Sequence, residues 1–198
     1  MSEEIRAFIA FELPDSLKES LMELQRELKG QVPQGVVRWT RPEGIHLTLK
    51  FLGQTPVDQI EDIAEALSSA CAPFSPLTYT ASGLGCFPNL RRPRVIWVGI
   101  EDPAGELSEL QKAVEDACVE SGFERERRAF HPHLTLGRVR RRASRGQRRA
   151  ISELLQEREI ASLGTVTVRK VSLIRSELRP TGAVYTTLRE VKLHPSPT

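Results

Sequence analysis

The chain has 198 residues, of which 39% are apolar and 27% charged, and its formal net charge is +2. This length allows one or two domains with a substantial core, and the composition is ordinary for a globular protein. The three cysteines, Cys71, Cys86 and Cys118, form no Cys-x-x-Cys pair, which argues against a disulfide framework and a zinc site. The first apolar run is too short for a signal peptide, and nothing approaches a membrane span. We therefore expect a reduced, cytoplasmic protein with no membrane partner.

Strands alternate with helices in the first half of the chain. A strand is expected over 5–13, and Leu17, Leu21, Leu24 and Leu28 then recur at helical spacing until Gly30. A short strand over 36–39, a strand over 45–52, a helix over 60–67 and a strand over 77–84 follow.

The second half repeats this order. A strand over 95–100 precedes a helix that Asp102-Pro103 opens and Gly122 closes. A strand over 130–139, a helix over 144–157 and strands over 165–174 and 184–193 complete the chain. Such a repeat predicts two similar lobes related by an approximate two-fold axis, in an α+β fold with helices outside antiparallel sheets that line a central cleft. We expect one bilobal domain over 1–198, with repeat halves of about 1–90 and 91–198.

One tetrapeptide occurs in both halves, as His46-Leu47-Thr48-Leu49 and again as His133-Leu134-Thr135-Leu136. A single His-x-Thr is usually structural, but a second identical copy arises by chance in roughly one chain of a few hundred. In a strand, residues two apart share a face. His and Thr of each copy should therefore point one way, and Leu47, Leu49 and Phe51 the other. Two such strands facing each other would form a proton-transfer site that needs no metal.

These residues resemble the 2H phosphoesterase superfamily, which has two His-x-Thr/Ser-x motifs on two lobes. Within it the chain is similar to the bacterial and archaeal RNA 2′,3′-cyclic phosphodiesterases, historically called 2′-5′ RNA ligases. The resemblance extends over nearly the whole chain and has no departure at the motif positions. It includes the segments 6–10, 39–53, 87–99 and 130–138 and, near the C-terminus, Ser176, Gly182 and Tyr185.

The resemblance implies hydrolysis of a terminal 2′,3′-cyclic phosphate of RNA to a 2′-phosphomonoester without a cofactor or metal. It assigns His133 as the base and His46 as the acid, an order that the residues alone do not fix. Thr48 and Thr135 would stabilise the charge that grows on the phosphate oxygens. The implied partners are RNA ends such as tRNA fragments, or small cyclic nucleotides, bound by a monomer.

Substrate-binding candidates surround the motifs. Arg138 lies five positions after His133, so a regular strand would turn it away from the site unless a bulge re-aims it or the strand ends first. Phe130, Trp39 and Phe87 are candidates for stacking on a nucleobase, although core packing is the favoured alternative for each. His131 is expected at the rim of the site. A metal site formed by His131 and His133 is conceivable, but it lacks acidic or cysteine partners at ligand spacing.

Arginines gather around the second motif, and a basic block of this kind suits a phosphate-bearing partner as well as a solvated surface. Its members are Arg125, Arg127, Arg128, Arg138, Arg140, Arg141, Arg142, Arg145, Arg148 and Arg149.

Three other functions compete with hydrolysis. A non-catalytic module that binds RNA ends would need the basic block but not two histidines, and a protein-interaction domain would carry the motifs by accident. A nucleotide-dependent ligase is disfavoured because the chain has no Gly-x-x-x-x-Gly-Lys-Ser/Thr loop. ATP-independent 2′-5′ ligation remains as a side activity implied by the resemblance.

Overall fold

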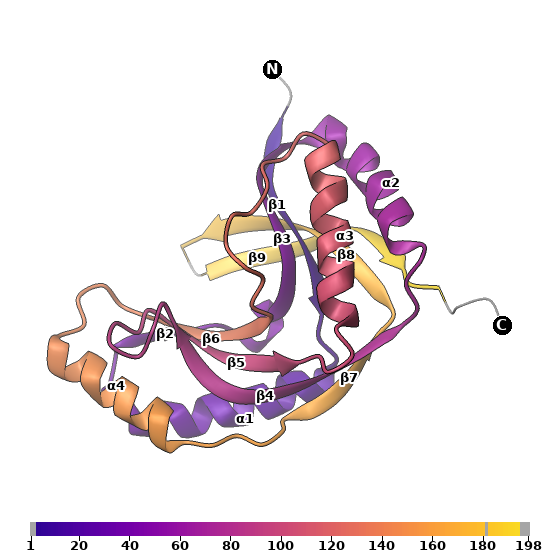
Figure 1. Ribbon diagram of the computed structural model, residues 1–198. Coiled ribbons are helices and arrows are strands. Elements are labelled where there is room, and N and C mark those ends of the chain that lie inside the picture. Colours follow the sequence, from indigo (N-terminus) through magenta and orange to yellow (C-terminus); the bar gives the residue numbers. More distant parts are fainter. Residues whose placement is uncertain (1–2, 181, 195–198) are drawn as a thin grey trace.

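The computed structural model describes residues 3–180 and 182–194 and shows an α+β fold, as predicted (Figure 1). Its helices and strands, in chain order, are β1 (Glu4–Glu12), α1 (Asp15–Gln31), β2 (Val37–Trp39), the 3-10 helix η1 (Pro42–Gly44), β3 (His46–Pro56), the 3-10 helix η2 (Val57–Gln59), α2 (Ile60–Cys71), β4 (Leu77–Phe87), β5 (Val95–Glu101), α3 (Glu106–Glu120), β6 (His133–Val139), α4 (Arg145–Glu157), β7 (Gly164–Val168), β8 (Lys170–Arg179) and β9 (Gly182–Lys192).

Within the described residues, nine strands form one continuous sheet in which all neighbours are antiparallel. The order is β7-β4-β5-β6-β3-β1-β8-β9, with β2 added beside β6. The two motif strands, β3 and β6, therefore lie at the centre of the sheet. Beyond β3 come β1, β8 and β9, and beyond β6 come β5, β4 and β7.

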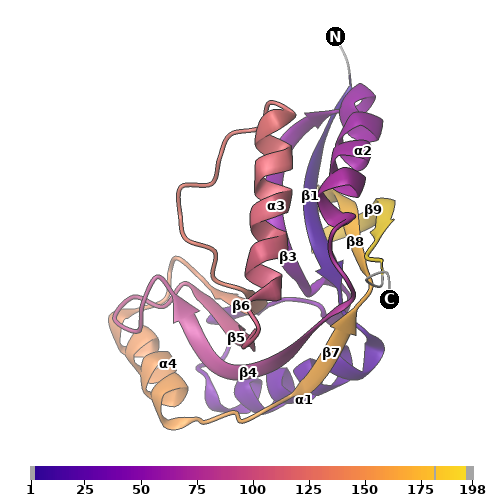
Figure 2. The ribbon, with the colours of Figure 1, turned by 45° about the vertical axis from the view of Figure 1, so that its right-hand side comes forward.

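The two spatial lobes exchange elements between the halves of the sequence. The strand β4 belongs to the first half but pairs with β5, and β8 belongs to the second half but pairs with β1. The helices cross over in the same way: α3 packs beside α2 and against β3, whereas α1 packs against β7 (Figures 1 and 2). Each lobe is thus built from both halves, which ties the two lobes together around the motif strands.

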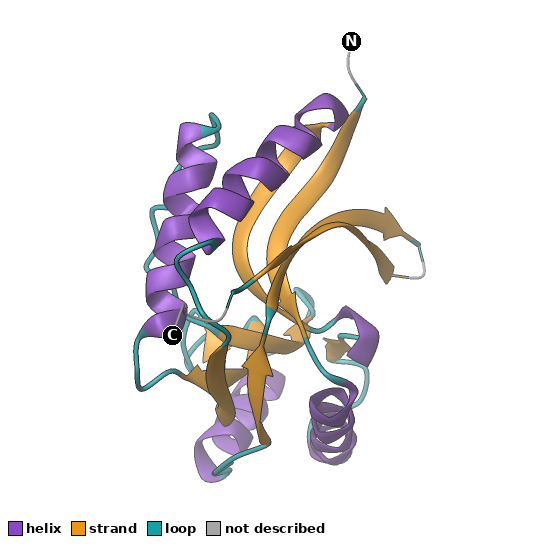
Figure 3. Cartoon of the chain, turned by 90° about the vertical axis from the view of Figure 1, so that its right-hand side faces the viewer, coloured by secondary structure: helices purple, strands orange, loops and turns teal. Residues whose placement is uncertain are grey.

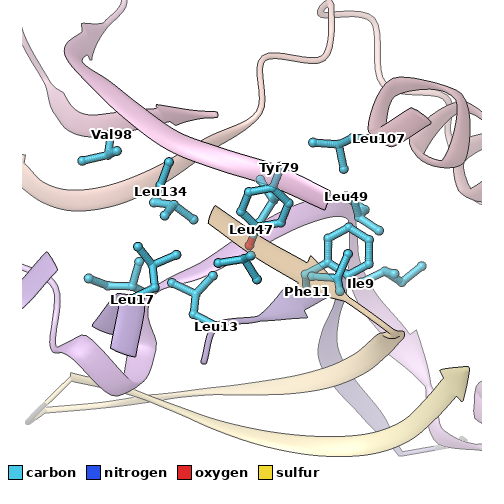
Figure 4. Packing of buried hydrophobic residues seen from close by; sticks show 14 of the residues in the cluster. Ile9, Phe11, Leu13, Leu17, Leu47, Leu49, Tyr79, Val98, Leu107 and Leu134 are labelled. Carbon is cyan, nitrogen blue, oxygen red and sulfur yellow. The ribbon is translucent and has the colours of Figure 1, made fainter. Parts of the chain in front are cut away.

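The helices lie on the outer side of the curved sheet, and a large hydrophobic core fills the space between (Figure 3). The core includes the leucines of both motifs. Leu47 and Leu134 are completely buried (Figure 4), and so is Leu136. Leu17, Leu21 and Leu28 of α1 recur on one face and are buried with them. Burial of this face, at about 25 cal/mol per Å², is the main force that holds the motif strands in place.

One predicted strand is wrong. The segment 165–174 was expected to be a single strand, but it contains β7 and the first half of β8, which belong to opposite ends of the sheet. The break falls at Arg169, where neither glycine nor proline marks a turn. Val166 and Val168 alternate with polar residues before it, and Val171 and Leu173 do so after it in the opposite phase. The chain passes from one lobe to the other here. The phase shift marks a break in the strand, but it does not say that the partner strand changes.

Two other boundaries also shift. The helix expected to open at Asp102-Pro103 begins only at Glu106, and the Asp102 carboxylate accepts backbone hydrogen bonds from Leu107 and Ser108. The second motif strand begins at His133 instead of Phe130. No helix among the described residues is long and apolar enough to cross a membrane.

Candidate active site

The two motif strands meet at their leucines. Leu47 of β3 pairs with Leu134 of β6 in antiparallel register. This register brings His46 toward Thr135 and His133 toward Thr48, so each histidine has a hydroxyl from the other motif as its cross-strand neighbour. All four side chains line one cleft of about 2230 Å³. The approximate two-fold axis therefore passes close to the Leu47–Leu134 pair.

Both motif strands contain a β-bulge at the fourth residue of the motif. On β3, Thr48 pairs with Ala10 and Lys50 with Ile9, which leaves Leu49 as the extra residue. On β6, Thr135 pairs with Trp97 and Gly137 with Ile96, which leaves Leu136 as the extra residue. A bulge of this kind reverses the facing of the residues that follow it, up to the next irregularity in the strand.

The bulges re-aim the residue five positions after each histidine. Arg138 is exposed and lines the cleft with His133 and Thr135, so a bulge resolves the difficulty that its spacing raised. Phe51, at the same position of the first copy, was expected on the buried leucine face. That expectation is wrong: Phe51 is 66% exposed and lines the cleft. The two lobes thus present an aromatic ring and a guanidinium at equivalent positions.

The His133 ring is held by a backbone carbonyl group just before the start of β6. Its Nδ1 lies 2.6 Å from the His131 carbonyl oxygen. A carbonyl only accepts, so Nδ1 carries the hydrogen and the neutral ring keeps Nε2 as an acceptor. Phe87 meets the ring edge-to-face, with 4.8 Å between the ring centres. Burial lowers the pKa of His133, the hydrogen bond to His131 opposes this, and the positive charge of Arg138 lowers the pKa further.

His46 lies in a more enclosed aromatic setting. Phe8 stacks on its ring with 4.5 Å between the ring centres, and Tyr185 meets it edge-to-face at 5.1 Å. Burial lowers the pKa of His46 to about 4, whereas a hydrogen bond with the Gly44 backbone and the charge of Glu12 act in the opposite direction. In both copies of the motif, the histidine ring thus forms a hydrogen bond with the backbone of the residue two positions before it. The charge of His133 also lowers the His46 pKa, because the two imidazoles share one cleft.

Comparisons with known proteins agree with this duplicated site. A model of the LigT-like phosphoesterase family matches the chain twice, over residues 11–97 and 98–185. The chain belongs to this family. A protein of Methanothermobacter thermautotrophicus named RNA 2′,3′-cyclic phosphodiesterase is 35% identical over 190 residues, which is 96% of this chain and 100% of the relative. A protein of the same name from Archaeoglobus fulgidus is 34% identical and covers 93% of this chain and 98% of its own length.

Solved structures of similar proteins have the same fold. A crystal structure of a Thermus thermophilus protein superposes with a TM-score of 0.80 at 26% identity, covering 97% of this chain and 100% of the other. The crystal structure of E. coli LigT with 3′-AMP has a TM-score of 0.77 at 23% identity, covering 96% and 99%. The cleft described above thus belongs to a fold that this phosphoesterase family shares.

The aromatic candidates lie at the cleft but are not equivalent. Phe87 contacts both His133 and Trp97, and its half-buried ring lines the cleft. Phe130 and Trp39 also line the cleft, yet both pack against the core, and the ammonium of Lys29 lies 5.8 Å from the Trp39 ring centre. His131 lines the cleft beside Phe87. Base stacking by Phe130, Trp39 and Phe87 stays a prediction.

A buried ion pair in this LigT-like phosphoesterase was missed by sequence reasoning. Lys50, directly after the first motif, is buried and binds the Glu115 carboxylate of α3 at 2.6 Å. The same ammonium donates to the Glu124 carbonyl at 2.6 Å, and the same carboxylate oxygen accepts from the Glu126 backbone at 2.8 Å. The pair therefore fastens the segment 121–132, which carries Arg125, Arg127 and Arg128, above the cleft.

Positive charge predominates around the cleft. Among the described residues that line it, eight are arginine or lysine and four are glutamate. Two of the glutamates are already paired, Glu115 with Lys50 and Glu126 with Arg128. No group of three or more histidine, cysteine, aspartate or glutamate side chains in the described part of the chain is arranged to hold a metal ion. The site as built suits an anionic ligand and acid–base chemistry.

Proposed function

We propose that the protein hydrolyses the terminal 2′,3′-cyclic phosphate of RNA to a 2′-phosphomonoester. The observation that carries this proposal is the pair of histidines that face one cleft, each with a threonine from the opposite motif at its side. Two curated relatives that are about a third identical over nearly the whole chain are named RNA 2′,3′-cyclic phosphodiesterase. The function thus rests on the family together with the geometry of this chain's own site.

The reaction requires one proton to leave water and another to reach the departing oxygen. One imidazole takes a proton from water, whose oxygen then forms a bond to phosphorus. The bond between phosphorus and the ribose 3′ oxygen breaks, and the second imidazole donates a proton to that oxygen. The hydroxyls of Thr48 and Thr135 donate hydrogen bonds to the non-bridging oxygens, where negative charge grows. No electron transfer is involved.

We assign His46 as the acid and His133 as the base. Glu12 is the cross-strand partner of His46, and its negative charge favours the protonated ring. Arg138 acts on His133 in the opposite sense and favours the neutral ring, whose Nε2 is free to accept a proton. Burial lowers both pKa values in the free protein, but an anionic phosphate between the rings would raise both. The opposite effects of Glu12 on the His46 pKa and of Arg138 on the His133 pKa would remain.

Phe51 and Arg138 supply the substrate contacts that differ between the lobes. The exposed Phe51 ring contributes little hydrophobic stabilisation in the free protein. A nucleobase that stacks on it would cover its apolar face. The Arg138 guanidinium suits a phosphate oxygen, because its planar fork can donate two parallel hydrogen bonds.

The experiment that tests the function is incubation with an oligoribonucleotide that ends in a 2′,3′-cyclic phosphate. We expect conversion to the 2′-phosphomonoester, identified by chromatography against both isomers. Formation of the 3′-phosphate, or the absence of conversion by folded protein, would contradict the proposal. Binding without conversion would instead favour a module that recognises RNA ends.

A further inference from the structure

Two arginines face each other at one end of the cleft. Arg38 of β2 and Arg138 of β6 are direct partners in the antiparallel register, and both are exposed. Directly opposed residues of neighbouring strands point to the same face, and both of these line the cleft that holds the two histidines. Like charges in this arrangement repel each other and destabilise the strand pair.

No described side chain relieves this repulsion. Neither guanidinium forms a hydrogen bond or an ion pair with a carboxylate in the described part of the chain, whereas Arg125, Arg128 and Arg149 each have one. The arrangement therefore lacks an anion, and a group with two or more acceptor oxygens would complete it.

The backbone is built to bring these two strands close together. Gly137 precedes Arg138, and a Cβ atom there would lie 2.8 Å from a Val37 methyl group and 3.2 Å from the Arg38 carbonyl oxygen. A side chain at 137 would thus push β2 away from β6. The close approach of β2 places the Arg38 guanidinium at the cleft instead of leaving it at a remote edge.

The position of the pair fits the neighbouring phosphate of a nucleic acid chain. Thr135 and Arg138 lie on the same face of β6, and three residues with one bulge span roughly 7–10 Å. This is an internucleotide step away from the place where Thr135 and His133 would hold the reacting phosphate. A single nucleotide cyclic phosphate has no second phosphate to reach this pair.

We propose that Arg38 and Arg138 form a second phosphate subsite, which binds the phosphodiester on the 5′ side of the terminal nucleotide. The inference rests on the proposed function and specifies its substrate class: ends of RNA chains in preference to cyclic mononucleotides. Arginine suits this task because its fork binds phosphate oxygens in a bidentate manner. Arg138 also lies beside the reacting centre, so Arg38 is the residue that reports on the subsite alone.

The test compares three substrates: adenosine 2′,3′-cyclic phosphate, the diadenosine with the same cyclic end, and that dinucleotide with a neutral methylphosphonate linkage. The readout is the ratio of kcat/KM for each dinucleotide to that for the mononucleotide. In the wild type, the natural dinucleotide should be favoured about tenfold over its methylphosphonate analogue, the usual worth of a charge-assisted hydrogen bond. Arg38→Gln should lower the dinucleotide ratio several-fold and reduce the difference between the two linkages, although Arg138 remains.

The matched control is Arg26→Gln, which removes an exposed arginine on α1 outside the cleft. This variant should keep the wild-type ratio, and Arg38→Lys should recover part of it because the charge is retained. The subsite is wrong if Arg38→Gln keeps the full dinucleotide preference, or if the neutral linkage costs the wild type nothing.

A binding measurement separates failure of the subsite from failure of the proposed function. The probe is a labelled diadenosine with a terminal 2′-phosphate, titrated at several salt concentrations. Arg38→Gln should weaken binding about tenfold and reduce the slope of log K against log salt by about 0.7, the value for one phosphate on a single strand. If no cyclic substrate is hydrolysed but this difference appears, the subsite stands and the proposed function fails. If the slope and the affinity are unchanged, the subsite is overturned.

Discussion

At the scale of single residues, the site depends on two leucines that do not touch a ligand. Leu49 and Leu136 are the extra residues of equivalent bulges, and each turns the residue two positions later toward the cleft. The pattern of burial over His46–Leu52 repeats residue for residue over His133–Val139. The duplication therefore extends from the tetrapeptide to the geometry of the strand, and it places Phe51 and Arg138 in matching positions.

Replacement of Phe51 by alanine should weaken substrate binding without unfolding the protein, because the ring is 66% exposed. The loss of base stacking is worth about 1–3 kcal/mol, which corresponds to an increase of roughly 5- to 150-fold in KM. Phe51→Trp keeps a stacking face and should keep most of the affinity. Steady-state kinetics on a cyclic-phosphate dinucleotide give both numbers. An unchanged KM in Phe51→Ala would show that the ring does not contact the base.

Replacement of Glu12 by glutamine should change the pH profile. Glu12 lies opposite His46, and its charge raises the His46 pKa. Without that charge the imidazolium is less stable, so the limb of the kcat/KM profile that His46 controls should move to lower pH by a few tenths of a unit. The other limb should stay in place, and Glu19→Gln on the exposed face of α1 serves as control. A shift to higher pH, or no shift of either limb, contradicts this role of Glu12.

The sequence predicted the placement of the two motif histidines at one cleft better than that of the residues around them. An identical tetrapeptide in both halves was enough to predict a shared site for His46 and His133, because period-two alternation assigns their faces. The same alternation misplaced Phe51, since a bulge is not marked by glycine or proline here and so leaves no signal in the sequence. Arg38 was missed for a different reason: its partner across the sheet is 100 positions away in Arg138.

At the scale of elements, the segment between α3 and β6 is fastened by a buried charge pair. Lys50 and Glu115 both have side chains that are less than a tenth exposed, and they share contacts with the backbone at Glu124 and Glu126. The second oxygen of Glu115 is buried without a hydrogen-bond partner in the described part of the chain. An arrangement of this kind stabilises one conformation of the segment only as long as both partners are present.

Lys50→Met should therefore lower the free energy of unfolding by about 3–5 kcal/mol, because it leaves the Glu115 carboxylate buried without its cation. The double variant Lys50→Met/Glu115→Leu should regain most of this loss, since no unpaired charge remains. Urea denaturation measures both. Lys112→Met, in an exposed pair with Asp116, should have no measurable effect. A double variant that is less stable than Lys50→Met would refute the explanation.

At the scale of the whole molecule, the exchange of strands between the halves was beyond the reach of local patterns. The predicted strand over 165–174 contains both β7, which pairs with β4, and the first part of β8, which pairs with β1. Hydrophobic alternation records which face of a strand is buried, but not which neighbour it pairs with. The α+β class and the two similar lobes were predicted correctly because the repeat itself is visible in the sequence.

The arginines around the second motif divide into two groups. Arg125, Arg128 and Arg149 bind carboxylates of their own chain, and Arg148 donates to backbone carbonyl oxygens. The others have no such partner among the described residues. They are Arg127, Arg138, Arg140, Arg141, Arg142 and Arg145.

Longer RNA ends should accordingly bind more tightly than mononucleotides, and their affinity should fall with salt. The logarithm of the binding constant should decline by roughly 0.7 per neutralised phosphate for each tenfold rise in salt. Titration of a labelled oligoribonucleotide from low to moderate salt gives the slope. An affinity that does not change with salt would show that these arginines form only a solvated surface.

The two-histidine mechanism is tested most directly by kcat for His46→Ala, His133→Ala and the double variant on an oligoribonucleotide with a 2′,3′-cyclic end. Each single change should lower kcat by about 10²–10⁴. The double variant should lose far less than the product of the two, because an acid and a base that act in one step are not additive. Thr48→Ala and Thr135→Ala should cost less, since a hydroxyl stabilises charge without moving a proton. Near-full activity in either folded histidine variant would contradict the mechanism.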